Sequence, residues 1–189
     1  MADHPVSAHR LRQAARTLAA GGVVAHATEG VWGLAADAFD IEAVERIVAA
    51  KQRDIARGLI VIADRPERLA PLVADEATTA WQRAIDSWPG PNTWLLPASA
   101  DAPWWLTGDH DTIALRQPAH DLSRALCQVF GGPLVSTSAN RSGQRPATQG
   151  WQVRARFGAA VDLVLGGRCD TPGQPSTIRD ATTDETIRG

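Results

Sequence analysis

Residues 136–143 form a segment that is dense in small hydrogen-bond donors. They read Ser-Thr-Ser-Ala-Asn-Arg-Ser-Gly and follow an apolar stretch that predicts a strand over residues 133–137. Hydroxyl, amide and backbone N–H groups suit the oxygens of a phosphate or the edge of a nucleobase. A solvated turn rarely needs so many small donors, so we interpret this loop as functional. The chain contains neither G-x-x-x-x-G-K-S/T nor G-x-G-x-x-G, so neither a P-loop nor a Rossmann fingerprint explains it.

The second candidate is a pair of cations, Lys51 and Arg53, at the end of a predicted helix. Lys51 is the only lysine among the 19 basic residues of the chain. Its retention indicates either a position that needs a compact ammonium or the chance survival of one exposed lysine. Residues two apart do not share a helix face, but at a fraying end both side chains could reach one polyanion. The alternative is that both complement the helix dipole.

Two further segments place polar groups at strand ends. Residues 26–34 follow a short apolar strand and offer a hydroxyl and glycine N–H groups, with an ordinary turn as the alternative. Arg116 ends the strand predicted over residues 112–116, where its parity differs from that of Ile113 and Leu115. An arginine at such an end can bind a carboxylate with two parallel hydrogen bonds. The alternative is a salt bridge at the sheet edge.

The elements that must position these groups alternate in type. A sequence of alternating strands and helices predicts an α/β fold, with a sheet that is mixed or in large part parallel. Ligands of such sheets bind outside the strand ends, which directs attention to the loops after Ala25, Arg116 and Thr137. We predict helices over residues 7–20, 41–51 after an N-cap at Asp40, 76–88, 121–130 and 151–157, and strands over 23–25, 59–63, 93–97, 112–116, 133–137, 161–165 and 176–179.

Composition limits the class of protein. With 189 residues, 44% apolar and 21% charged, the chain is expected to form one domain, residues 1–189. A net charge of −2 and a pI of about 6.2 argue against non-specific binding of nucleic acid as the main function. The longest apolar runs are far too short to span a bilayer, and the N-terminus has no export signal, so we expect a cytoplasmic protein without membrane contact. Two cysteines and five scattered histidines lack the spacing of a zinc site.

Taken together, these segments resemble the YrdC-type threonylcarbamoyl-adenylate synthases in their short, single-domain bacterial form. The matching stretches are ATEGVWGL, KQR followed by RGLIVIA, WPGPNTWLLPA, TIALR, PLVSTSANRSG and PSTIRD, which span Thr28 to Asp180. The resemblance implies a twisted, mixed, open sheet flanked by helices, with a concave ligand cleft. It also implies that L-threonine, bicarbonate and ATP are condensed to threonylcarbamoyl-AMP with release of pyrophosphate. The product would supply tRNA threonylcarbamoyl-transfer proteins for the threonylcarbamoyl-adenosine modification.

The resemblance also assigns residues. No dedicated catalytic side chain and no protein-held metal are expected, because an adenylation needs positioning and charge neutralisation, with Mg²⁺ accompanying ATP. Weak contact with tRNA or other RNA is compatible with this reading. By similarity, the threonine substrate would contact Thr28, Arg116, Ser136 and Ser176, and ATP would contact Lys51, Arg53, Thr112, Ser138, Asn140 and Arg188.

Some positions depart from the family pattern. Ala27 stands where the family commonly has proline, and Arg57 and Ile62 replace an Asn and a His that contact ligands in some longer members. We carry no role over to those two positions. Two rival functions remain open: an RNA-binding module acting in ribosome maturation or translation, and a nucleotide-dependent carbamoyl-transfer enzyme with a substrate other than threonine. The near-neutral pI and the absence of an aromatic-plus-basic run count against the first.

Overall fold

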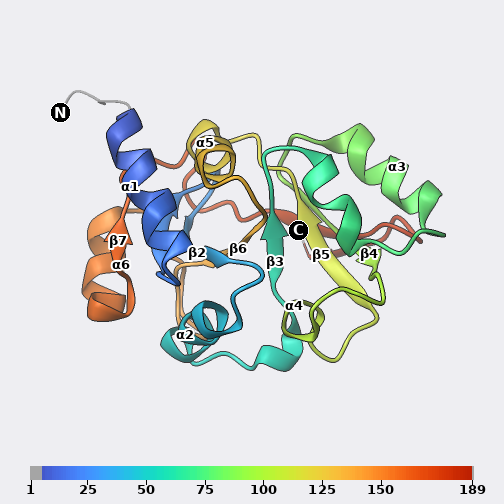
Figure 1. Cartoon of the computed structure of the whole chain (residues 1–189), viewed down its shortest axis with the longest axis horizontal. Coiled ribbons are helices and arrows are strands. Elements are labelled where there is room, and N and C mark those ends of the chain that lie inside the picture. Colours follow the sequence, from blue (N-terminus) through green and yellow to red (C-terminus); the bar gives the residue numbers. More distant parts are fainter. Residues whose placement is uncertain (1–5, 189) are drawn as a thin grey trace.

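The computed structural model describes residues 6–188, in which the strands form one mixed sheet of order β7-β1-β2-β6-β3-β5-β4-β8-β9 (Figure 1). The pairs β1–β7, β3–β5 and β4–β8 are parallel, and the other neighbours are antiparallel. The predicted mixed sheet is therefore confirmed. The strands are β1 (Val24–Ala27), β2 (Trp32–Asp37), β3 (Ile60–Ile62), β4 (Asn92–Pro97), β5 (Thr112–Arg116), β6 (Leu134–Ser138), β7 (Leu163–Val164), β8 (Thr177–Asp180) and β9 (Thr186–Arg188).

Two helices begin after a side-chain cap, at Ser7 and at Asp40, and the cap at Asp40 is the one that the sequence predicts. The Ser7 hydroxyl accepts a hydrogen bond from the Arg10 N–H, and the Asp40 carboxylate accepts one from the Ala43 N–H, so one free N–H group in each first turn is satisfied. The α-helices are α1 (Ala8–Ala19), α2 (Ile41–Lys51), α3 (Thr78–Ser87), α4 (Trp104–Thr107), α5 (Asp121–Phe130) and α6 (Gly150–Phe157). Short 3₁₀ turns cover Ile55–Arg57, Pro66–Arg68, Ala70–Leu72 and Gly158–Ala160.

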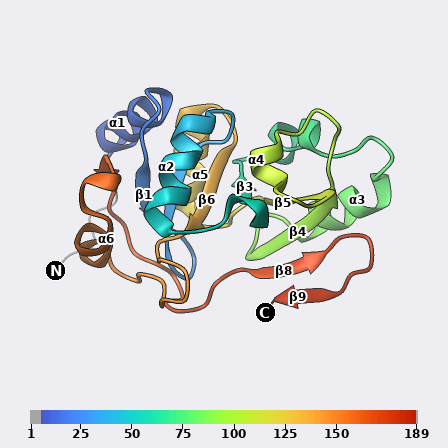
Figure 2. The same ribbon diagram turned by 90° about the horizontal axis from the view of Figure 1, so that it is seen from below.

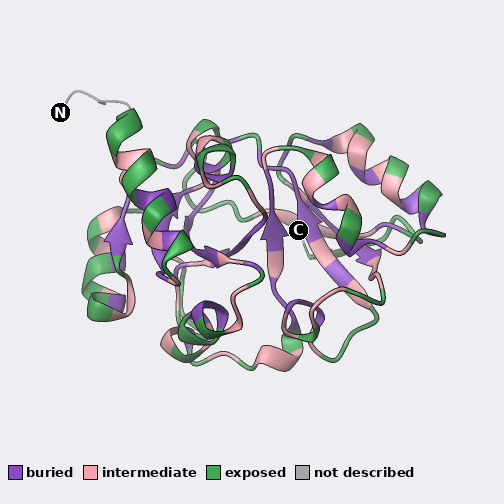
Figure 3. Cartoon of the chain, in the orientation of Figure 1, coloured by how far each residue is buried: buried purple, intermediate pink, exposed green. Residues whose placement is uncertain are grey.

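Two apolar clusters cover the two faces of the sheet. Ala35 of β2 packs with Leu18 of α1 and Leu126 of α5, whereas its neighbours Leu34 and Ala36 belong to the cluster that includes α2. Alternate residues of a strand point to opposite faces, so β2 is buried on both. Figure 3 shows the consequence: the strands are mostly buried, and each helix exposes its outer side.

Helices α1 and α5 cover only part of their face of the sheet. Ser136 of β6 pairs with Ala35, which faces these helices, and Ile62 of β3 pairs with Arg116 of β5. Directly paired residues point to the same face. Ser136, Ile62 and Arg116 line a cleft of about 1020 Å³, which is bordered by β8 and β9 beside β4 (Figure 2). The uncovered part of one sheet face therefore forms the floor of the cleft.

The structure corrects the sequence analysis in one central element. Residues 26–34 were expected to be a loop, but β1 continues to Ala27 and β2 begins at Trp32, so only residues 28–31 form the turn. Glycine and alanine make the β2 sequence a weak strand signal, and its burial on both faces removes the alternation that marks a half-buried strand. Helix α4 and strand β9 were also not predicted. The predicted domain, 1–189, includes residues 1–5 and 189, which lie outside the described residues.

Among residues 6–188, no helix has both the length and the apolar character that crossing a bilayer requires.

Candidate functional site

The cleft gathers almost all of the residues that the sequence analysis assigned to a ligand. Each of them lies in its lining except Lys51. The alternation predicted for β5 is confirmed, because Thr112 and Arg116 face the cleft while Ile113 and Leu115 are buried behind it. The cleft residues from the predicted set are Thr28, Arg53, Thr112, Arg116, Ser136, Ser138, Asn140, Ser176 and Arg188.

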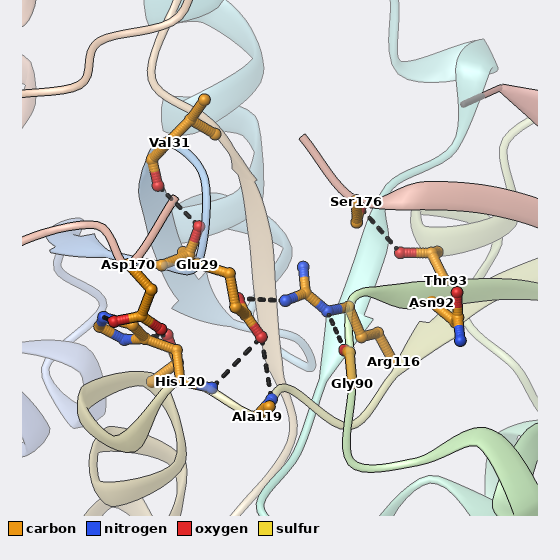
Figure 4. Close-up of polar contacts among 12 residues, drawn as sticks. Glu29, Val31, Gly90, Asn92, Thr93, Arg116, Ala119, His120, Asp170 and Ser176 are labelled. Carbon is orange, nitrogen blue, oxygen red and sulfur yellow. Dashed lines mark hydrogen bonds and ion pairs between the residues drawn. The ribbon is translucent and has the colours of Figure 1, made fainter. Parts of the chain in front are cut away.

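One end of the cleft centres on Arg116 (Figure 4). Its Nε donates to the carbonyl of Gly90 over 3.0 Å, and its Nη2 forms an ion pair with Oε2 of Glu29. The other oxygen of Glu29, Oε1, accepts from the backbone N–H groups of Ala119 and His120 over 2.9 and 3.2 Å. The sequence suggested either a carboxylate site or a salt bridge for Arg116, and the structure places a salt bridge inside the cleft.

Glu29 is the functional residue that sequence reasoning missed. Within residues 6–188 it is the sole Asp or Glu in the cleft lining. Burial would raise the pKa of its carboxyl group, but the charge and hydrogen bond of Arg116 outweigh burial, so the pKa lies below its ordinary value. Its position directly after the predicted site residue Thr28 was a signal in the sequence. The role of Glu29 was not visible there, because its partner Arg116 is distant in the chain.

Small hydroxyl groups surround this end of the cleft. Thr28 donates its hydroxyl hydrogen to the Val31 carbonyl over 2.6 Å, which fixes the side chain within the turn. Thr93 donates to the Ser176 hydroxyl over 3.1 Å, and Ser176 comes immediately before β8. The Arg116 end therefore offers a guanidinium group and several hydroxyl oxygens, which together suit a small zwitterion that carries a hydroxyl.

The other end of the cleft is cationic. Burial and the nearby charges of Arg57 and Arg188 lower the pKa of Arg53. The three guanidinium groups therefore lie close enough for the charges of Arg57 and Arg188 to act on Arg53. Arg53 donates to the Gly58 carbonyl over 2.9 Å, and Arg188 donates to the Ser176 carbonyl over 3.3 Å. Arg57, to which the sequence analysis assigned no role, lines the cleft. Asp54 is the one acidic group that acts on the pKa of Arg53, so the three guanidinium groups leave an excess of positive charge that favours a polyanionic ligand.

The donor-rich loop is held by its own side chains. The Ser138 hydroxyl donates to Oδ1 of Asn140 over 2.6 Å, and Nδ2 of Asn140 donates to the carbonyls of Arg141 and Gln144 over 3.0 and 2.9 Å. Asn140 therefore closes the loop on itself. This arrangement fixes the positions of the loop groups that face the cleft.

Lys51 lies behind this loop. Its Nζ donates to the carbonyl of Ser138 and, over 2.8 Å, to that of Asn140. The side chain is 3% exposed, and burial together with the charge of Arg53 lowers its pKa to about 8. The exposed-lysine interpretation is therefore wrong. Lys51 lies outside the lining of the cleft, where its ammonium clamps the loop after β6 to α2, and its contact with ATP stays a prediction.

His26 lies fully buried beside the Arg116 end. Its Nδ1 is 3.1 Å from the Ala27 carbonyl and 3.3 Å from the Ser123 hydroxyl. Burial, and then the charges of His120 and Arg116, lower its pKa to about 4, although Glu29 acts in the opposite sense. A neutral imidazole with so low a pKa is a weak base, so His26 is poorly suited to act as a general base.

This burial predicts a pH-dependent stability. His26 titrates near 6.5 when unfolded and near 4 when folded, so the unfolded chain binds more protons between these values and folding weakens as the pH falls. The contribution, about 3 kcal/mol, should be present above pH 6.5 and lost by about pH 4. Denaturant unfolding of His26→Phe across this range should show a smaller loss than the wild type. His9→Gln, at an exposed position of α1, is the control, and equal slopes for His26→Phe and wild type would contradict the prediction.

Among residues 6–188, no group of three or more His, Cys, Asp or Glu side chains is placed to hold a metal ion. Glu29 accepts from Arg116 and from backbone N–H groups, so its oxygens are already used.

Comparison with protein families gives a match over most of the chain. The family model for Sua5, YciO and YrdC proteins, described as "Telomere recombination", matches residues 16–188. The chain belongs to the Sua5/YciO/YrdC family. This confirms the resemblance inferred from the sequence motifs.

Curated Sua5/YciO/YrdC relatives share close to half of their residues with this chain. A threonylcarbamoyl-AMP synthase of Alkalilimnicola ehrlichii is 48% identical over 182 residues, which cover 95% of each chain. A threonylcarbamoyl-AMP synthase of Chromohalobacter salexigens is 47% identical, over 96% of this chain and 98% of that protein. The chain and these relatives therefore align over nearly their full lengths.

Solved structures of Sua5/YciO/YrdC proteins have the same fold. P. abyssi Sua5 in complex with L-threonine matches with a TM-score of 0.87 and 34% identity, over 97% of this chain and 54% of that one. The H234A/Y235A variant of P. abyssi Sua5 matches with a TM-score of 0.90 and 33% identity, over 98% of this chain and 57% of that one. The chain thus spans little more than half of either Sua5 protein. E. coli YciO, with a TM-score of 0.81 and 24% identity, shows the fold alone.

Proposed function

We propose that this chain is a threonylcarbamoyl-AMP synthase that condenses L-threonine, bicarbonate and ATP and releases pyrophosphate. The observation that carries the proposal is the division of one cleft into an Arg116 end lined by hydroxyl groups and a cationic end with Arg53, Arg57 and Arg188. The curated relatives with this name and the threonine-bound P. abyssi structure support it. The product would be the donor for threonylcarbamoyl-adenosine in tRNA.

The amino acid is proposed to lie at the Arg116 end. Arg116 would bind its carboxylate, and Thr28, Ser136 and Ser176 would surround its polar groups. The triphosphate is proposed to lie over Arg53 and Arg188, with Arg57 as an added cation. Thr112, Ser138 and Asn140 would contact the nucleotide from the floor and rim of the cleft, and Lys51 would keep the loop in place from behind.

The chemistry follows from this placement. The unprotonated threonine amine attacks the carbon of bicarbonate or CO₂ to form the carbamate. With bicarbonate one water leaves, and with CO₂ the amine gives up one proton to solvent. A carbamate oxygen then attacks the α-phosphorus of ATP, and pyrophosphate departs with the bonding electron pair. These steps need the two substrates held in line and the triphosphate charge balanced, which guanidinium and hydroxyl groups supply. We propose that Mg²⁺ enters as the Mg–ATP complex, held by phosphate oxygens.

The partners and the compartment remain proposals. We propose that threonylcarbamoyl-AMP passes to tRNA threonylcarbamoyl-transfer proteins in the cytoplasm, and that direct contact with tRNA is weak, in keeping with the net charge of −2. The rival functions lead to different results in the assay that follows.

One assay tests the proposed function. Pyrophosphate release from Mg–ATP should require L-threonine and bicarbonate together, because the carbamate cannot form without either. We expect turnover with L-threonine to exceed that with L-valine by about a hundredfold or more, since a site built around hydroxyl groups disfavours a substrate that lacks one. Equal turnover with L-valine would indicate a different carbamoyl-transfer enzyme. Salt-dependent binding of RNA without pyrophosphate release would favour the RNA-binding module.

A further inference from the structure

Glu29 joins separate parts of the cleft. Its Oε2 pairs with Arg116 on β5, and its Oε1 accepts from the N–H groups of Ala119 and His120, which precede α5. The carboxylate itself belongs to the turn between β1 and β2. Donors from two directions therefore converge on one side chain (Figure 4).

Only a carboxylate can face the Arg116 guanidinium with one oxygen and accept from the N–H groups of Ala119 and His120 with the other. Both oxygens of Glu29 are acceptors in use, and the side chain is 13% exposed, so water has little room to replace a lost contact. A glutamine amide has one oxygen and one NH₂ group. Whichever way it is turned, its NH₂ group faces either the Arg116 guanidinium or two backbone N–H groups, and a donor then meets a donor.

The consequence for Arg116 is a fixed orientation. Gly90 holds Nε and Glu29 holds Nη2, while the remaining terminal nitrogen, Nη1, points away from both partners (Figure 4). A guanidinium held at two of its nitrogens presents its free edge in one direction. This reduces the side-chain freedom that would be lost when a carboxylate binds.

We propose that Glu29 is a positioning residue for the amino-acid substrate: it stays paired with Arg116 and orients the free guanidinium edge toward the substrate carboxylate. The inference rests on the proposed function, because it takes a carboxylate to be the group that Arg116 receives. In the opposite arrangement Glu29 is a placeholder: its carboxylate occupies the place of the substrate carboxylate on Arg116 and must move away before threonine binds. The two arrangements predict opposite effects of removing Glu29 on threonine affinity. Loss of a positioning residue weakens threonine binding, and loss of a placeholder strengthens it.

The experiment is threonine titration by calorimetry on wild type, Glu29→Gln, Glu29→Asp and the control Asp64→Asn. Asp64 pairs with Arg68 at similar burial and lies outside the cleft lining. We expect the Kd for L-threonine to rise about ten- to a hundredfold in Glu29→Gln and less in Glu29→Asp, which keeps the charge but shortens the reach. The KM for ATP should change less than about threefold, and Asp64→Asn should bind threonine as the wild type does.

Three outcomes would overturn the proposal. Tighter threonine binding in Glu29→Gln would identify a placeholder, and unchanged binding would mean that Glu29 does not orient Arg116. Equal losses for threonine and ATP, together with a lower Tm, would indicate a purely structural role. ATP binding by each variant reports the folded fraction, so an unfolded variant cannot be mistaken for weak threonine binding. Failure of the proposed function would appear separately, as wild-type protein that binds no threonine.

Discussion

Replacing Arg116 by alanine should raise the KM for L-threonine by at least about a hundredfold, because the two charge-assisted hydrogen bonds that we propose between Arg116 and the substrate carboxylate would be lost at once. The KM for ATP should change little, since the cationic end of the cleft is built from other residues. The variant should also be less stable, because Glu29 loses the cation that compensates its buried charge. Initial rates across threonine and ATP concentrations, with thermal melting, measure the three effects.

A double variant separates binding from stability. In Arg116→Ala with Glu29→Ala, no unpaired charge remains, so much of the lost stability should return while threonine binding stays weak. If the double variant instead regained threonine affinity, Arg116 would not be the carboxylate ligand. Near-normal threonine KM in Arg116→Ala would lead to the same conclusion.

The second large effect is expected at Lys51, and it concerns ATP. In Lys51→Met the side-chain volume is kept, but the carbonyls of Ser138 and Asn140 lose a buried donor, at a cost to stability of about 1–3 kcal/mol each. The loop should then shift relative to the cleft. A misplacement of about 1 Å can cost about a hundredfold, so we expect kcat/KM for ATP to fall by that order while threonine affinity changes less.

The charge-conserving variant Lys51→Arg should also lose stability and activity. Lys51→Arg keeps the charge but puts a planar guanidinium into a site that is 3% exposed, so overpacking should lower both Tm and ATP turnover. The matched control is Arg16→Met, which removes an exposed cation from the last turn of α1. Full activity and normal Tm in Lys51→Arg would contradict the clamp. A similar loss of stability in Arg16→Met would point to the helix dipole instead.

Much of this fold was predictable because its signals are local. Helix caps such as Ser7 and Asp40 act within one turn, and the alternation of Thr112, Ile113, Leu115 and Arg116 reports which side of β5 is buried. The donor-rich loop was recognised from its composition, and it does lie at the cleft. The sequence motifs also identified the family correctly, whereas the ligand contacts of individual residues stay predictions.

Strand β2 shows where local signals fail. Its small residues give little strand propensity, and its position between β1 and β6 buries both faces. Arg57 is a second case, because a single exposed arginine carries no periodic signal, and it joins the cleft only through the packing of the chain around Gly58.

The sequence alone predicted the types and approximate boundaries of most elements, the family, and several of the residues that line the cleft. The tertiary structure decided which polar group meets which: Glu29 with Arg116, and Lys51 with the loop after β6. The physical reason is the range of the interactions. Periodicity and capping arise from neighbours a few residues away, whereas a hydrogen-bond partner depends on strand register and helix docking between distant segments. The partner of the Glu29 carboxylate and the partners of the Lys51 ammonium are therefore visible only in the folded chain.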